Sequence, residues 1–331
     1  MTATRASGSG ASGILLVDKS GGMTSHDVVS RARRMLGTRK VGHAGTLDPM
    51  ATGLLILGAN ASTRMLTYVV GLDKEYTATI RLGFATTTDD AEGDPIDEPT
   101  DASAVTNAAI AAAIEPLTGD ISQRPSTVSA IKVDGKRAYA LAREGIEVDL
   151  KERAVTVSAF EVLGVRRDAL VGGIPVVDVD VRVECSSGTY IRALARDLGA
   201  TLGVGGHLTA LRRTRIGPFA ILEARAIDDA PAVIPPQDAA ARLFPSVSLD
   251  AAQAADLANG KRIAVTAPPR GSDAADETDT PGPVAALAPD GTLIGLIAIV
   301  DGRARVLANF PTDSALPTDS VPTDTESSPS P

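Results

Sequence analysis

The amino-acid sequence predicts an α+β fold for most of this 331-residue chain. Stretches that alternate between apolar and polar residues, as strands do, occur among stretches with an apolar residue every three to four positions, as in helices. The two kinds of stretch do not follow a strict βαβ rhythm, which favours α+β over a doubly wound α/β fold. Hydrophobic residues make up 44% of the chain, enough for a sizeable core.

The first predicted elements follow a tail, residues 1–13, whose Gly, Ser, Ala and Thr content is typical of disorder. Residues 14–17 (Ile-Leu-Leu-Val) predict a short buried strand. Ser25 is then expected to cap a helix that ends at Gly37. The apolar side of that helix comprises Val28, Val29, Ala32, Met35 and Leu36.

Two further strands show clear alternation. Residues 75–82 place Tyr76, Ala78, Ile80 and Leu82 on one face, and residues 176–184 turn four valines inward. Between them lie an acidic loop (89–101) and a predicted helix (104–114). After a turn at 186–188, a helix is expected with Ile191, Leu194, Ala195 and Leu198 on its buried side.

A domain boundary is expected near 231–236, where the sequence reads Pro-Ala-Val-Ile-Pro-Pro. Beyond it, residues 237–310 predict a smaller domain with a helix at 250–258 and strands near 284–288 and 293–300. The Pro-, Asp- and Gly-rich segment 267–283 is expected to be a flexible insertion. The Pro-Thr-Asp repeats of 311–331 predict a disordered tail, since they offer little apolar surface to bury.

Composition limits the location and the partners of the chain. One cysteine, Cys185, cannot form an internal disulfide, which fits a reducing cytosol, and its place after an alternating apolar run predicts a buried structural thiol. The sequence has no apolar stretch of signal-peptide or membrane-span type, so we expect a soluble cytoplasmic protein without membrane contact.

The charge distribution is uneven. The net charge is −9, but residues 231–331 hold 13 Asp and Glu against 6 Lys and Arg. Local basic clusters, rather than net charge, attract phosphates, although such clusters are as often solvated helix faces. The clusters comprise Arg31, Arg33, Arg34, Arg39 and Lys40, and then Arg212, Arg213 and Arg215.

The segment 39–58, RKVGHAGTLDPMATGLLILG, is the most informative for chemistry. It combines a basic lead-in, glycines that let a backbone approach a ligand, His43 and Asp48. Taken alone, Asp48 is more readily explained as the N-cap of a helix with Pro49 at its first position. An isolated His43 is likewise more often structural than catalytic. The coincidence of these groups favours a functional site.

This segment and several others resemble the TruB family of tRNA pseudouridine synthases, which modify uridine 55 in the T loop. Three departures occur: Ser20 and Ser126 stand where the family usually has Pro, and Arg64 where Lys is common. The matching motifs, in order, are LLVDKSGGMTSHDVV, KVGHAGTLDPMATGLL, KEYTATIRLGFATTTDDAEG, SAIKVDGKRAYALAREG, SSGTYIRALARDLG and GGHLTALRRTRIGPF.

The resemblance implies a pseudouridine synthase fold over 14–230, with a mixed, largely antiparallel sheet and an RNA-clamping loop at about 125–153. It implies a PUA-like RNA-binding domain over 237–310. The expected activity is isomerisation of uridine to pseudouridine in tRNA by base flipping, without a guide RNA, cofactor, metal or obligatory protein partner. We expect the chain to be a monomer.

Residue roles carry over from the resemblance position by position. Asp48 corresponds to the catalytic aspartate, Tyr76 to the tyrosine that stacks on the target base, Tyr190 to a tyrosine under the sugar, and Arg192 to an arginine paired with the aspartate. Without the resemblance, Arg192 could be solvated or paired with Asp197 on the surface. The remaining expected substrate contacts are His43, Gly42, Lys19, Arg64, Lys132, Leu211, Arg212 and Arg213.

Isomerisation must break the C1′–N1 bond and form a C1′–C5 bond. A carboxylate can form a covalent intermediate at C1′ of the ribose or at C6 of the ring, and the sequence does not choose between them. Three alternative functions were weighed: a guide-dependent relative, a non-catalytic RNA-binding or tRNA-folding protein, and a nucleoside hydrolase. A hydrolase usually has a second carboxylate or metal ligands, and the sequence has no such cluster.

Overall fold

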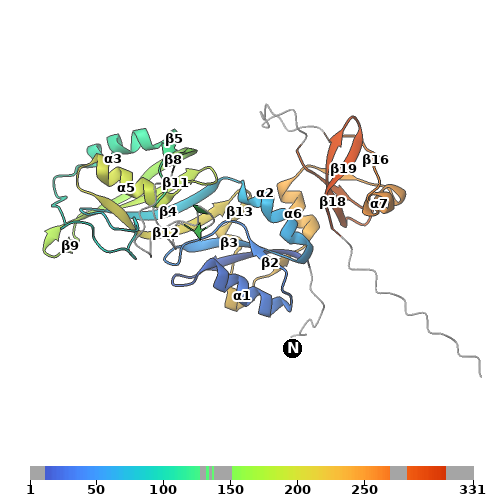
Figure 1. The fold of residues 1–331 in the computed structure, drawn as a ribbon, viewed down its shortest axis with the longest axis horizontal. Coiled ribbons are helices and arrows are strands. Elements are labelled where there is room, and N and C mark those ends of the chain that lie inside the picture. The colour runs from blue at the N-terminus through green and yellow to red at the C-terminus, as the bar shows by residue number, and fades with distance from the viewer. Residues whose placement is uncertain (1–11, 127–131, 134–135, 138–150, 269–281, 311–331) are drawn as a thin grey trace, which may run out of the picture. The chain divides into compact units, whose positions relative to one another are not determined.

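The computed structural model describes residues 12–126, 132–133, 136–137, 151–268 and 282–310. The predicted tails, most of the clamping loop and most of the 267–283 insertion therefore lie outside the described residues. The chain divides into two compact units, Met1–Ala239 and Ala240–Pro331. Both are drawn in Figure 1.

The first unit is built on one large sheet (Figure 1). Only β3 and β12 run parallel among the described pairs of this sheet, and all other pairs are antiparallel, which confirms the predicted mixed, largely antiparallel arrangement. In spatial order its strands are β14 (Val233–Ile234), β1 (Gly13–Lys19), β3 (Thr52–Ala59), β12 (Gly206–Ile216), β4 (Lys74–Leu82), β11 (Val177–Cys185), β8 (Arg153–Arg166) and β5 (Gly119–Gln123), with β2 (Val41–His43) on β3 and β13 (Phe219–Ala220) on β12.

Helices and short hairpins complete this unit. The α-helices are α1 (Ser25–Leu36), α2 (Leu66–Val70), α3 (Asn107–Ile114), α5 (Ile191–Thr201) and α6 (Pro236–Leu243), which contains the division point. The 3-10 helices are η1 (Asn60–Met65), η2 (Glu115–Leu117), η3 (Ile221–Glu223) and η4 (Ile227–Asp229). Two small hairpins pair β6 (Lys132–Val133) with β7 (Lys136–Arg137) and β9 (Leu170–Val171) with β10 (Ile174–Pro175).

The predicted apolar faces meet in one core. Tyr76, Ala78, Ile80 and Leu82 of β4 are buried together with the inward valines of β11. Leu194 and Leu198 of α5 pack into the same cluster. Alternation along the strands and the 3.6-residue period of the helix therefore predicted the buried sides of these elements correctly.

The start of α1 differs from the prediction. Thr24, not Ser25, is the N-cap: its Oγ1 accepts from the Asp27 N–H at 3.1 Å, and the Asp27 carboxylate accepts from the Thr24 N–H at 2.9 Å. The Ser25 hydroxyl is buried instead and exchanges hydrogen bonds with the backbone of Leu47 at 2.9 and 3.1 Å. The predicted end at Gly37 is confirmed, with a left-handed φ of 62°.

The second unit is a small β domain. Its five strands lie in the order β15 (Ser246–Ser248), β17 (Val284–Leu287), β18 (Leu293–Val300), β19 (Arg303–Asn309) and β16 (Ile263–Ala264). Helix α7 (Ala251–Ala258), capped by Asp250, packs into the core of this unit through Leu257. The predicted small C-terminal β domain is therefore confirmed. Among the helices that the structure describes, none is long and apolar enough to cross a membrane.

Replacing Thr24 with Ala tests the revised helix start. The Ala variant loses the side-chain acceptor of the capping box, so we expect the free energy of unfolding to fall by about 1 kcal/mol. Thr24→Ser keeps the hydroxyl and should stay close to the original chain. Denaturant unfolding of the three proteins measures the difference, and an unchanged stability in the Ala variant would contradict this assignment.

Candidate active site

The loop 44–51 connects β2 to β3 and carries Asp48. After Asp48 the chain makes a turn, closed by a hydrogen bond from the Ala51 N–H to the Asp48 carbonyl at 3.1 Å, and then enters β3 at Thr52. No helix follows Asp48, so its interpretation as a helix cap is wrong. The side chain is 37% exposed, which leaves the carboxylate accessible from outside the protein.

Arg192 lies in the first turn of α5 and points toward this loop. Its side chain is 6% exposed, and its Nη2 lies 3.0 Å from Oδ2 of Asp48. Nη1 donates to the carbonyl of Thr88 at 2.9 Å. The alternative of a surface pair with Asp197 is wrong, because Asp197 pairs with Arg196 at 2.9 Å. The guanidinium group is therefore directed at the predicted nucleophile.

A second carboxylate, Asp90, shares Arg192. Its side chain is 3% exposed, and its Oδ2 lies 3.6 Å from Nε of Arg192. Its Oδ1 accepts from Thr88 Oγ1 at 2.5 Å and from the Glu92 N–H at 3.0 Å. Asp90 was not among the predicted site residues, because it is one of several acids in the acidic loop 89–101. Its only sequence signal is its place within the TTTDDAEG motif.

The two tyrosines expected to contact substrate are held differently. Tyr76 is 7% exposed, and burial raises the pKa of its hydroxyl while the nearby charge of Arg213 opposes that rise. Tyr190 immediately precedes α5, and its backbone N–H and C=O both bond the side-chain amide of Gln123, at 2.8 and 3.1 Å. Gln123 is 2% exposed and holds the backbone of Tyr190, and it was not among the predicted site residues.

Three other predicted contacts lie near the loop. His43 and Gly42 belong to β2, directly before it, and burial lowers the pKa of the His43 imidazole. Leu211 is 8% exposed on β12 and pairs across the sheet with Ala78, two residues from Tyr76. Arg64 is exposed on η1. These roles stay predictions.

Two predicted substrate contacts, Lys19 and Arg213, are buried in this structure. The Lys19 ammonium is buried and donates to the carbonyls of Ser20, Met23 and Pro49 at 3.1, 2.7 and 3.2 Å. Burial lowers its pKa, although the charge of Asp48 opposes that effect. Arg213 is 1% exposed, and its guanidinium group also donates to backbone carbonyls. Both cations are therefore bonded to the protein backbone in this structure and are not exposed at its surface.

Arg212 has a different environment, because neighbouring strand residues point to opposite faces. Its side chain is 40% exposed and makes two bonds to the Asp18 carboxylate, at 3.0 and 2.7 Å. Lys132 belongs to β6, but its side chain lies outside the described residues, as does most of the 125–153 segment. Within the described ranges, no group of three or more His, Cys, Asp and Glu side chains is arranged to hold a metal ion.

Comparison with protein families matches three consecutive models. Residues 33–191 match the TruB family pseudouridylate synthase N-terminal domain, residues 192–230 match the tRNA pseudouridylate synthase B C-terminal domain, and residues 244–311 match the tRNA pseudouridine synthase II C-terminal model. Together the three models cover most of both units.

Curated relatives and solved structures agree with these matches. The chain is 57% identical to tRNA pseudouridine synthase B of Leifsonia xyli subsp. xyli, over 91% of this chain and 97% of the relative. It is 52% identical to the enzyme of the same name from Arthrobacter sp., over 90% and 96%. Among solved structures, an H/ACA RNP bound to a substrate RNA containing 2′-deoxyuridine matches with a TM-score of 0.63 at 24% identity, over 91% of this chain and 86% of that one. A Cbf5-Nop10-Gar1 complex matches with a TM-score of 0.61 at 26% identity, over 91% and 84%. The family models and the bacterial relatives together show that this chain belongs to the TruB family of pseudouridylate synthases.

Proposed function

We propose that this chain isomerises uridine to pseudouridine in tRNA, with Asp48 as the nucleophile. The observation that carries the proposal is the 3.0 Å contact between Asp48 and the buried Arg192. It holds an accessible carboxylate close enough to Tyr76 for its charge to influence the pKa of that tyrosine, and Tyr76 offers an aromatic surface to a base. The names of the bacterial relatives, tRNA pseudouridine synthase B, support the reaction and the substrate.

Access to the target requires base flipping, because the reacting atoms of a stacked base are out of reach of a side chain. Unstacking costs a few kcal/mol. Stacking on an aromatic ring returns about 1–3 kcal/mol per base. Tyr76 supplies that ring in this proposal, and Tyr190, fixed through its backbone by Gln123, supports the sugar.

In the reaction, Asp48 attacks C1′ of the ribose or C6 of the ring. The C1′–N1 bond breaks, the uracil turns, and the C1′–C5 bond forms. The bond between Asp48 and the substrate then breaks, which frees the carboxylate. The proton lost from C5 is balanced by the proton gained at N1, so the product has the same atoms as the substrate. Arg192 orients the carboxylate for attack, and Asp90 orients Arg192.

The substrate is proposed to be uridine 55 in the T loop. The chain is proposed to act as a cytoplasmic monomer, without a guide RNA or an obligatory protein partner. The 91% and 97% coverage between this chain and the Leifsonia relative supports the same activity in both. A guide-dependent enzyme is the alternative. Incubating the purified chain with unmodified tRNA transcript, followed by position-resolved detection of pseudouridine, separates the two, because a guide-dependent enzyme would leave the transcript unmodified.

Asp48→Asn tests the nucleophile directly. The amide has nearly the size of the carboxylate but cannot attack the ribose or the ring, so single-turnover pseudouridine formation should be abolished. Binding of tRNA should persist, because phosphate contacts lie elsewhere. Thermal melting should show a folded protein, with at most a modest loss of stability from the unpaired Arg192.

Glu92→Gln is the matched control for Asp48→Asn. The Glu92 carboxylate is close enough to Asp48, Asp90 and Arg192 for their charges to influence its pKa, which burial raises. This variant should retain turnover, since Glu92 is not assigned a role in the reaction. A folded, tRNA-binding Asp48→Asn protein with near-normal turnover would rule out the proposed mechanism.

Arg212→Ala tests one of the remaining basic contacts. If its guanidinium group meets a phosphate, tRNA affinity should weaken and the slope of log affinity against log salt should flatten by roughly one unit. Arg167→Ala, which removes an exposed arginine bonded to Val105 and Asn107, should leave the slope unchanged. An unchanged slope in Arg212→Ala as well would assign Arg212 to the Asp18 ion pair alone.

A further inference from the structure

We infer that Arg213 is a positioning residue that holds the nucleophile loop 44–51 in the orientation that presents Asp48. The inference rests on the proposed function, in which Asp48 is the nucleophile. Arg213 does not pair with the Asp48 carboxylate. It acts through the backbone of the loop, and it lies beside Tyr76 on the same face of the sheet.

The hydrogen bonds of Arg213 go to three backbone carbonyls. Nε donates to Leu54 at 2.8 Å, Nη2 to Gly45 at 3.1 Å, and Nη1 to Thr46 at 3.5 Å. Arg213 is 1% exposed, and it has the largest volume of the fully buried side chains in the described part of the protein. Gly45 and Thr46 precede Asp48 in the loop, and Leu54 follows in β3. One guanidinium group therefore joins both arms of the loop around Asp48.

Strand pairing brings Arg213 under this loop. β12 and β3 pair in parallel, with Arg213 opposite Gly53. Gly53 has a φ of +99°, and a Cβ at that position would lie 2.3 Å from the carbonyl oxygen of Arg213. Only glycine permits such a close backbone approach. This close approach holds the backbone of Arg213 against β3, and from there its side chain reaches the carbonyls of Gly45 and Thr46.

The same side chain lies next to the proposed stacking tyrosine. In the β12–β4 pairing, Arg213 is opposite Tyr76, and cross-strand partners share a face. Because Arg213 bonds the loop and lies opposite Tyr76, it links the position of the loop to the position of the aromatic ring. Between them, Arg213 and Lys19, which bonds Pro49, hold the backbone on both sides of Asp48.

Arginine suits this place better than lysine. Its planar guanidinium group offers five N–H donors in a fixed geometry, so it can bond carbonyls that lie in different directions. A lysine would keep the positive charge but not this fixed, planar arrangement of donors. Burying a cation against carbonyls without a carboxylate is costly, whereas an apolar residue would suit the surrounding core. The hydrogen bonds to the loop carbonyls offset part of this cost and order the loop.

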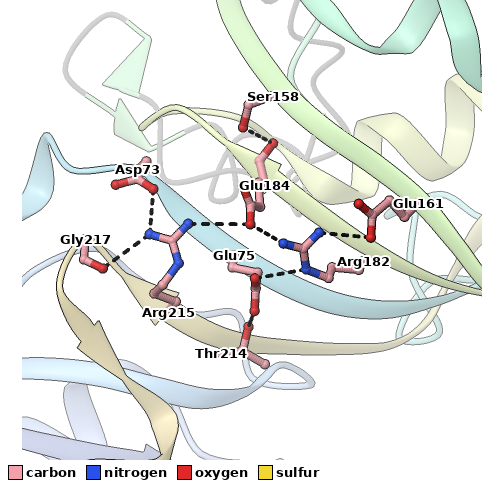
Figure 2. Close-up of polar contacts among 9 residues, drawn as sticks. All are labelled: Asp73, Glu75, Ser158, Glu161, Arg182, Glu184, Thr214, Arg215 and Gly217. Atoms are coloured by element: carbon pink, nitrogen blue, oxygen red, sulfur yellow. Dashed lines mark hydrogen bonds and ion pairs between the residues drawn. The ribbon is translucent and has the colours of Figure 1, made fainter. Parts of the chain in front are cut away.

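Arg182 provides a matched control on the opposite face of the same sheet (Figure 2). It pairs across the sheet with Thr77, the neighbour of Tyr76 in β4, so its side chain points away from the Tyr76 face. Its guanidinium group contacts Glu75 at 3.0 Å, Glu161 at 2.9 Å and also Glu184. Like Arg213, it has three partners, but all three lie in strands of the sheet and none belongs to loop 44–51.

The experiment compares Arg213→Met, Arg213→Lys and Arg182→Met in the full-length chain. At saturating tRNA, Arg213→Met should lower the single-turnover rate by about 100-fold, the effect of misplacing a reacting group by about 1 Å. The dissociation constant for tRNA should stay within about threefold, because phosphate contacts are made elsewhere. Arg213→Lys should recover roughly tenfold of the lost rate, since it keeps part of the bonding. Arg182→Met should lower the melting temperature while leaving the rate within about threefold.

Hydrogen exchange of residues 44–51 in the free protein gives a readout that does not depend on catalysis. It should accelerate in Arg213→Met and not in Arg182→Met. Unchanged exchange together with an unchanged rate would overturn the inference, as would an equal loss of rate in Arg182→Met. If Arg213→Met does not fold, Arg213→Lys decides, and a normal rate in that variant counts against positioning. A wild-type chain that forms no pseudouridine would contradict the proposed function, while the exchange experiment still tests Arg213.

Discussion

The candidate active site depends on the burial of one guanidinium group. Arg192 is 6% exposed, so its charge must be matched inside the protein. Its partners come from separate segments: Asp48 from the loop before β3, and Thr88 and Asp90 from the loop after β4. Each partner replaces a hydrogen bond that the Arg192 guanidinium group would make to water. None of these segments can therefore move away without leaving part of a buried charge unpaired. The Asp48–Arg192 ion pair therefore contributes both to the stability of the folded site and to the position of the proposed nucleophile.

The candidate active site lies on one face of the central sheet, and a second group of polar side chains lies on the other face. Along β4, Tyr76 points to the face covered by α5, while Glu75 points to the other face and contacts Arg182 and Thr214 (Figure 2). A one-residue slip in register would exchange the two faces. The ion pairs on the polar face therefore help to specify the register that places Tyr76 in the site.

Much of the fold could be predicted because apolar alternation has a direct structural meaning. The buried faces of β4 and β11 followed from their sequences, and the motifs led to Asp48 and Arg192. The burial of Lys19 and Arg213 could not be predicted, because their partners are backbone carbonyls, which every residue carries and no pattern marks. The role of Asp90 was hidden for a related reason: nothing in a run of acids distinguishes the one that contacts a buried arginine.

These buried cations also change how the charge of the chain relates to RNA binding. Residues 1–230 hold 26 Lys and Arg against 28 Asp and Glu, and Lys19, Arg192 and Arg213 are taken up inside the protein. A cation bonded to buried carbonyls or carboxylates contributes little to the field that a phosphate meets at the surface. Lys74 is buried as well, but so are the carboxylates of Asp89, Asp90 and Asp178, so the described buried charges nearly cancel. The surface of this part of the chain is therefore no more basic than its composition indicates. The proposed binding of tRNA must then rely on local groups of exposed cations, such as Arg34, Arg39 and Lys40 around the end of α1.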